Sequence, residues 1–252
     1  MIETDAPPPP SASVGERPRR TTKALPPKHR APANSWSARL RTLWIRVVPL
    51  LLLLLGAEIR IRQWLGGRSL WLDESLIARS IVNRSYGDLL IEPLFHNQAA
   101  PLGWLWAERL CVDLFGRDER SLRIVPLLAG LGTLFLTWRL ARRLLPPGLV
   151  PVAVGLVALA PNLVYYGNEV KQYSSDVLVV LVIIAMALRI PAPVNVGRPL
   201  VRFTLFAVAA VWLSHAAVFA LAGTSLVLAL RPLADRDVLR SLRVSVVLSP
   251  WL

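Results

Sequence analysis

The chain has 252 residues, 54% of them hydrophobic, and a mean hydropathy of +0.48. This composition excludes an ordinary soluble domain and predicts several membrane-spanning helices. A formal net charge of +13 could indicate nucleic-acid binding. The basic residues, however, gather in the N-terminal tail and in clusters between apolar runs, which is typical of the cytoplasmic side of a membrane protein and counts against that function. Cys111 is the only cysteine and no histidines have metal-ligand spacing, so neither an internal disulfide nor a metal motif is expected.

Residues 1–42 are predicted to form a disordered, basic, proline-rich cytoplasmic tail, since they bury too little apolar surface to offset the entropy of ordering. Residues 43–252 are predicted to form the membrane domain. Its first span is Leu43–Ile59, and the basic tail before it places the following loop, residues 65–120, on the outer face.

The outer loop is predicted to carry two juxtamembrane amphipathic helices. Leu72–Val82 is expected to be capped by Asp73. Pro101–Phe115 is too short and too charged for a span, so we expect it to lie at the interface with Trp104 and Trp106 at headgroup depth. If this helix does not cross, the arginines after the second span fall inside, as the charge rule prefers.

The remaining apolar runs complete an all-α integral membrane protein with about six transmembrane helices. Phe203–Leu230 holds 28 uncharged residues, about 42 Å as one helix. Two short spans turning at Ser214-His215 keep the following arginines inside, so a hairpin is predicted. The other predicted spans are Ile124–Trp138, Gly148–Gly167 and Val177–Leu188, and residues 244–252 resemble the start of another.

This topology brings three polar sets to one outer face: Asp73-Glu74, the turn 168–176, and His215, with Gln98 nearby. Acids at a membrane face indicate function. In a regular helix Lys171 would lie about 140° from Asp176, so the two can share a site only if the turn is irregular.

Together these residues carry a family resemblance. An Asp-Glu pair after the first span, a loop helix opening at Pro101, and the run Tyr165-Tyr166-Gly167-Asn168-Glu169-Val170-Lys171-Gln172-Tyr173-Ser174-Ser175-Asp176 resemble GT-C superfamily membrane glycosyltransferases. The resemblance is greatest to the glycosyltransferase 39, protein mannosyltransferase-like type, including aminoarabinose transferases and Rgt-like lipopolysaccharide transferases. The chain is about half the usual length and looks like a short or truncated member.

The resemblance implies transfer of a sugar from a polyprenyl-phosphate donor to a glycan, lipid or protein acceptor at the outer face of the plasma membrane, with inversion. Asp73 is the expected base, Asp176 the second site acid, and Glu74 a further catalytic candidate. Ala100 stands where a basic residue often holds the donor phosphate, and Lys171, Arg79 or Arg84 could take that role. The expected substrate-binding residues are Glu169, Lys171, Gln172, Tyr173, Gln98 and His215. No metal ligand is assigned, and a divalent cation is left open.

Simpler interpretations stay open beside these. Asp73 and Asp176 could only cap helices, and Glu74 could be a solvated first-turn acid. Glu169 and Lys171 could form an interfacial ion pair, and His215 could be a packed turn residue. For the whole chain, the alternatives are a multi-span transporter or lipid-handling protein, against which the uncharged span centres count, and an inactive glycosyltransferase fragment.

Overall fold

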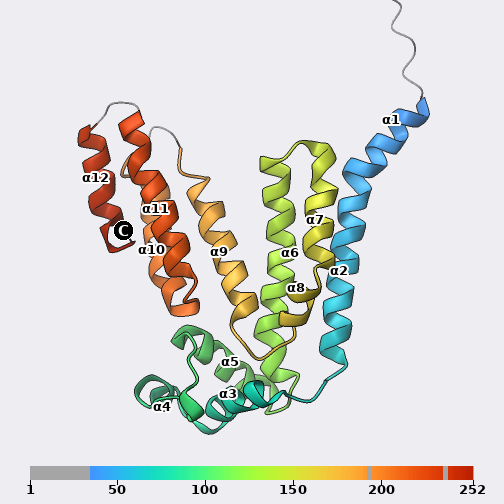
Figure 1. Cartoon of the computed structure of the whole chain (residues 1–252), viewed down its shortest axis with the longest axis vertical. Coiled ribbons are helices and arrows are strands. Elements are labelled where there is room, and N and C mark those ends of the chain that lie inside the picture. The colour runs from blue at the N-terminus through green and yellow to red at the C-terminus, as the bar shows by residue number, and fades with distance from the viewer. Residues whose placement is uncertain (1–34, 192–193, 235–237, 252) are drawn as a thin grey trace, which may run out of the picture.

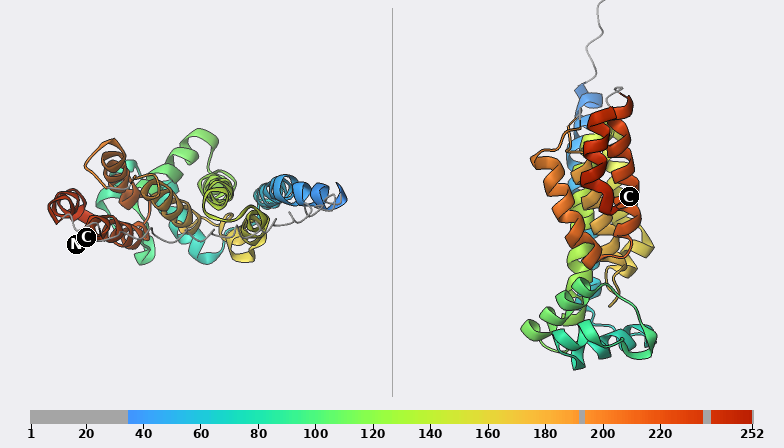
Figure 2. Two further views of the ribbon diagram at one scale, coloured as in Figure 1. Left: turned by 90° about the horizontal axis from the view of Figure 1, so that it is seen from above. Right: turned by 90° about the vertical axis from the view of Figure 1, so that its left-hand side faces the viewer.

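A computed structural model describes residues 35–191, 194–234 and 238–251, and every regular element in these ranges is helical. The long helices run roughly along one direction, and three shorter helices form a separate unit across one end (Figures 1 and 2). The α-helices are α1 (Ser35–Thr42), α2 (Val48–Leu65), α3 (Leu72–Asn83), α4 (Tyr86–Ile91), α5 (Leu102–Phe115), α6 (Ile124–Leu144), α7 (Val150–Leu159), α8 (Pro161–Tyr166), α9 (Tyr173–Ala187), α10 (Arg198–Leu213), α11 (Ala217–Ala234) and α12 (Val238–Leu248). Short π or 3-10 segments are η1 (Leu43–Val47), η2 (Phe95–Asn97), η3 (Ser121–Arg123), η4 (Pro147–Leu149) and η5 (Ser249–Trp251).

Two helical stretches are long and apolar enough, by length and composition, to cross a membrane: Ser37–Leu65 and Ser121–Leu144. Three further apolar helices are shorter, namely Pro147–Leu159, Tyr173–Ala187 and Ala217–Arg231. The predicted all-α class is confirmed for the described residues, while the number of six spans stays a prediction. Most of the predicted tail lies outside the described residues, and its described end is helical rather than disordered, because α1 continues into the first span.

A proline divides the third apolar segment into α7 and α8. Pro161 has no backbone N–H, so the carbonyls one turn before it lose their usual donors. Arg60 of α2, which is 1% exposed, replaces them by donating to the carbonyls of Val157 and Ala158, each at 3.1 Å. Arg60 directly follows the predicted first span Leu43–Ile59, and these hydrogen bonds fasten α2 to α7.

Within residues 65–120, predicted as an outer loop, the chain forms a helical unit made of α3, α4 and α5 with its own apolar core. The predicted helices over 72–82 and 101–115 are confirmed as α3 and α5. Trp104, for which headgroup depth stays a prediction, is 1% exposed and faces the core of the unit, where it packs with Ile77 and Leu105. Trp106 is 36% exposed and donates its indole N–H to the carbonyl of Tyr86.

The start of α3 also differs from expectation. The N-cap position is Trp71, and Asp73 lies in the first turn, where its Oδ1 accepts the backbone N–H of Glu74 at 3.0 Å. Glu74 takes over the capping function, since its Oε2 accepts the backbone N–H of Trp71 at 2.9 Å. Asp73 is therefore not the cap, and its other oxygen is available for other contacts.

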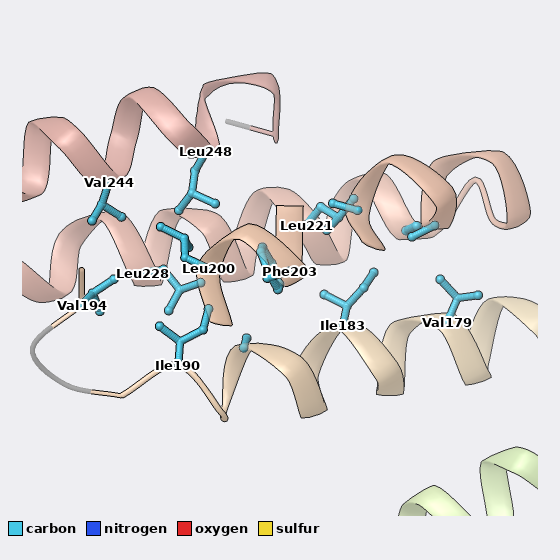
Figure 3. Packing of buried hydrophobic residues seen from close by; sticks show 14 residues of the cluster. Val179, Ile183, Ile190, Val194, Leu200, Phe203, Leu221, Leu228, Val244 and Leu248 are labelled. Atoms are coloured by element: carbon cyan, nitrogen blue, oxygen red, sulfur yellow. The ribbon is translucent and has the colours of Figure 1, made fainter. Parts of the chain in front are cut away.

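The helices α9 to α12 pack around a second core, in which Ile183, Phe203, Leu221 and Leu248 each come from a different helix (Figure 3). Between α10 and α11 the chain turns back after Leu213. The hairpin predicted at Ser214-His215 is confirmed, because three residues separate two antiparallel helices there. This turn lies at the same end of the molecule as the α3–α5 unit (Figure 1).

The arginine-rich end of α6 and the end of α9, which Arg189 follows, lie at the opposite end of the molecule (Figure 1). The α3–α5 unit and the arginine cluster after α6 are thus separated by the length of the long helices. This separation is the arrangement that the charge argument predicts. The direction in which the chain is inserted into a membrane stays a prediction.

Candidate functional site

The segment between α8 and α9 is a turn rather than a regular helix. The N–H of Lys171 donates to the carbonyl of Glu169 at 2.8 Å, and α9 begins only at Tyr173. The helical-wheel objection to Lys171 therefore does not apply, because that objection assumed regular helix over 168–176. The turn instead brings Lys171 to Asp73 of α3 and Glu169 to Arg68.

Glu74 is the centre around which the turn is held. Its carboxylate is fully buried and lies 3.3 Å from the guanidinium of Arg123, which is 1% exposed. It also accepts the backbone N–H of Val170 at 2.9 Å, in addition to that of Trp71. The interpretation of Glu74 as a solvated first-turn acid is wrong, since one side chain joins the start of α3, the start of α6 and the α8–α9 turn.

Asp73 points away from this buried centre toward solvent. Its side chain is 62% exposed, and its Oδ2 lies 3.4 Å from Nζ of Lys171. Lys171 is itself 9% exposed and donates to Oε1 of Gln98 at 3.0 Å. Three residues predicted for the site, from three separate parts of the sequence, therefore meet at one place.

Asp176 lies on the first turn of α9, before the apolar run that starts at Val177. Its Oδ1 accepts the hydroxyl of Ser214 at 2.6 Å. Partial burial raises the pKa of the Asp176 carboxyl, and the Ser214 hydrogen bond and the nearby His215 oppose that rise. Ser214 and His215 belong to the α10–α11 turn, so this turn completes the second acidic position.

Tyr173 is the first residue of α9, one turn before Asp176. Partial burial raises the pKa of its phenol, and the charges of Asp73, Glu169 and Asp176 add to the rise. The rings of Tyr166 and Tyr173 are in edge contact, 5.0 Å between centroids.

Glu169 faces a different neighbour from the one predicted. Its Oε1 lies 3.5 Å from the guanidinium of Arg68, which also stacks over the ring of Tyr165 at 4.6 Å. The predicted interfacial pair of Glu169 with Lys171 is therefore replaced by pairs with Arg68 and with Asp73. A cavity of about 240 Å³ opens beside Arg68 and Tyr165 and is bounded by Gln63, Gly66 and Asn168.

The two arginines considered for the donor phosphate are engaged elsewhere. Arg84 is buried, donates to the carbonyl of Pro93 at 2.7 Å and pairs with Glu92. Arg79 lies over the ring of Phe95. Lys171 is the candidate of the three that reaches Asp73.

Sequence reasoning missed Arg68, Arg123 and the pairing of Ser214 with Asp176. Arg123 could have been noticed in the sequence, because an arginine directly before an apolar run at the predicted outer end opposes the usual charge bias.

Within the described ranges, no group of three or more His, Cys, Asp or Glu side chains is placed to hold a metal ion. Gln172 is near the turn, but its buried Oε1 has no hydrogen-bond partner among the described residues.

The match to a known family decides how this site is interpreted. Residues 99–249, about three fifths of the chain, match the family model of dolichyl-phosphate-mannose-protein mannosyltransferases. The chain belongs to this family. Membership implies a membrane glycosyltransferase that uses a lipid-linked sugar, in agreement with the GT-C resemblance. No curated protein and no solved structure matches the chain.

Proposed function

We propose that this member of the mannosyltransferase family transfers a sugar from a polyprenyl-phosphate donor to an acceptor hydroxyl at the outer membrane face, between Asp73 and Asp176. The meeting of Asp73, Lys171 and Gln98 is the observation that supports this most. It places an exposed carboxylate, a sheltered cation and polar binding groups together, next to the ends of apolar helices where a lipid-linked donor would arrive.

Asp73 is the proposed base. Its exposed carboxylate accepts the proton of the acceptor hydroxyl while that oxygen bonds to the anomeric carbon. The bond from this carbon to the phosphate oxygen breaks, and the electron pair leaves with the phosphate. A single displacement of this kind inverts the anomeric carbon, by analogy with inverting glycoside chemistry.

Lys171 is proposed to stabilise the departing phosphate. An ammonium group has three N–H donors, and the described contacts use two of them, toward Gln98 and Asp73. The third is available to a phosphate oxygen, and the leaving group needs such a cation more than it needs a proton. Lys171 would thus take the phosphate-binding role that Ala100 cannot have, because alanine carries no positive charge.

The other residues have binding and positioning roles in this proposal. Asp176, with Ser214 and His215, would bind sugar hydroxyls. Glu74 is fully buried and bonded to Arg123 and Val170, so we assign it to positioning the turn rather than to the catalytic role expected from the sequence. Glu169 and Gln172 would shape the same turn from the side of Arg68.

The test is sugar transfer in membranes that contain the full chain, supplied with radiolabelled polyprenyl-phosphate sugars. Asp73→Asn is expected to lower transfer by about 10²- to 10⁴-fold, the usual contribution of a general base. Glu119→Gln is the control, since it removes an exposed carboxylate from the same loop. Turnover of Asp73→Asn equal to that of the control would exclude Asp73 as the base.

A further inference from the structure

A cavity lies far from the candidate site, between the ends of α6 and α9 that are opposite the α3–α5 unit (helix ends in Figure 1). It has a volume of about 530 Å³, within the range of small-ligand pockets. Arg139, Arg142 and Arg143 from α6 and Arg189 from the residues after α9 line it.

The positive charge of this cavity is not balanced by nearby acids. Within the described ranges no carboxylate pairs with any of the four arginines. The C-terminal ends of two helices supply only about half a negative charge each, so roughly three positive charges remain in excess. An orienting charge on a membrane protein requires arginines at this face, but it does not require them to converge on one cavity.

Two of the four arginines are fixed in place and two are free to bind. Arg143 donates to the carbonyl of Leu188 at 2.7 Å, and Arg142 lies over the ring of Trp138 at 5.0 Å. Arg139 and Arg189 are exposed, and no side-chain partner is found for either within the described part of the chain. Guanidinium groups bind phosphate oxygens through paired N–H donors, which makes this pair suited to a phosphate group.

The remaining walls of the cavity are apolar. Phe135, Leu136, Leu140 and Ala185 line the part of the cavity toward the middle of the two helices. Arg139 to Arg143 lie roughly 23 to 29 Å along the axis from the start of α6, close to the thickness of a bilayer core. A phosphate on the arginines would therefore be at headgroup depth, and an attached acyl chain would meet apolar side chains.

We propose that this cavity binds the phosphate headgroup of an anionic membrane phospholipid, which bridges α6 and α9 at the face opposite the candidate site. The cavity takes such a lipid because it combines unpaired guanidinium groups with apolar walls at the right depth. A soluble phosphate would use the arginines but not the apolar walls, and a zwitterionic lipid would bring its own cation against them. This inference does not depend on the proposed sugar transfer.

The experiment measures lipid retention by the purified full chain with native mass spectrometry in detergent. Phosphatidylglycerol is expected to bind at least tenfold more tightly than phosphatidylcholine. The double variant Arg139→Gln/Arg189→Gln should reduce this preference to about twofold or less. Arg79→Gln/Arg117→Gln is the matched control, since it removes two exposed arginines from the α3–α5 unit at the other end.

Three results would overturn the proposal: no preference for phosphatidylglycerol in the wild-type chain, an equal loss in the control variant, or complete displacement of the lipid by inorganic phosphate at millimolar concentration. If the double variant fails to fold, a photoactivatable phosphatidylglycerol is cross-linked to the wild-type chain. Adducts within 135–143 or 185–189 support the site, and adducts confined to other segments refute it.

Discussion

The buried pair of Glu74 and Arg123 allows the sharpest test of how the candidate site is held together. Both side chains are essentially inaccessible to solvent, and they join the first turn of α3 to the start of α6. Glu74→Ala would leave the guanidinium of Arg123 buried without its carboxylate partner and next to a cavity. It would also remove the acceptor for the N–H of Val170, a residue that is fully buried.

The expected loss of stability follows from these contacts. Removing one partner of a buried ion pair costs about 3–5 kcal/mol, because the other charge stays desolvated. An orphaned buried N–H adds about 1–3 kcal/mol, while the N–H of Trp71 can bind water because that residue is 61% exposed. Glu74→Ala should therefore destabilise the chain by about 4–8 kcal/mol. Glu74→Met/Arg123→Met should cost clearly less than the two single changes together, since no charge remains buried without a partner.

The assay is chemical unfolding of the detergent-solubilised chain, analysed as a double-mutant cycle. Glu58→Ala is the control, because Glu58 pairs with Arg62 on an exposed face and should cost less than about 1 kcal/mol. A loss below about 1 kcal/mol for Glu74→Ala, or strictly additive single and double variants, would refute the view that this pair fixes the turn.

Two further predictions concern pH. Ser214→Ala removes a hydrogen bond that lowers the pKa of Asp176, so this pKa should rise further. The acid limb of the pH profile of kcat/KM should then move to higher pH. An unchanged profile would show that turnover does not depend on the ionisation of Asp176. Burial raises the pKa of Glu108 well above its ordinary value of 4.5. The carboxyl therefore keeps its proton to a higher pH in the folded state than in the unfolded state. Stability should fall as pH rises from about 4.5 through the raised pKa, by up to about 1.4 kcal/mol per pH unit, and Glu108→Met should remove this slope in unfolding measurements.

Much of the helical arrangement could be predicted from charge and apolar length. The hairpin after Leu213 followed from keeping the later arginines on one side, and the short charged run 101–115 was recognised as a loop helix. Burial inside the loop unit could not be predicted in this way. Trp104 has the same composition signal whether it faces headgroups or a core, and only the packing of α3 against α5 decides between them.

The candidate site was partly predictable for a related reason. Asp73, Lys171 and Asp176 stand out because charges beside apolar runs are rare. The contacts that hold the site together join segments about 100 residues apart, as in the hydrogen bond that the N–H of Val170 donates to Glu74. Adjacent acids such as Asp73 and Glu74 look equivalent in sequence, yet the turn of α3 directs one to solvent and the other into the protein.

The distance between the two acidic positions depends on α5, which packs on α3 and on the end of α10. A side chain at Gly103 of α5 would place its Cβ 2.8 Å from the carbonyl oxygen of Trp212, two residues before Ser214. Because that neighbour is backbone, Gly103→Ala must push α5 and α10 apart, at a cost of about 1–3 kcal/mol. A shift of up to about 1 Å at Ser214 should lower turnover by as much as about 100-fold. Gly87→Ala is the control, since its Cβ would meet nothing closer than 3.7 Å. Wild-type turnover in Gly103→Ala would show that α5 does not set the spacing between Asp73 and Asp176.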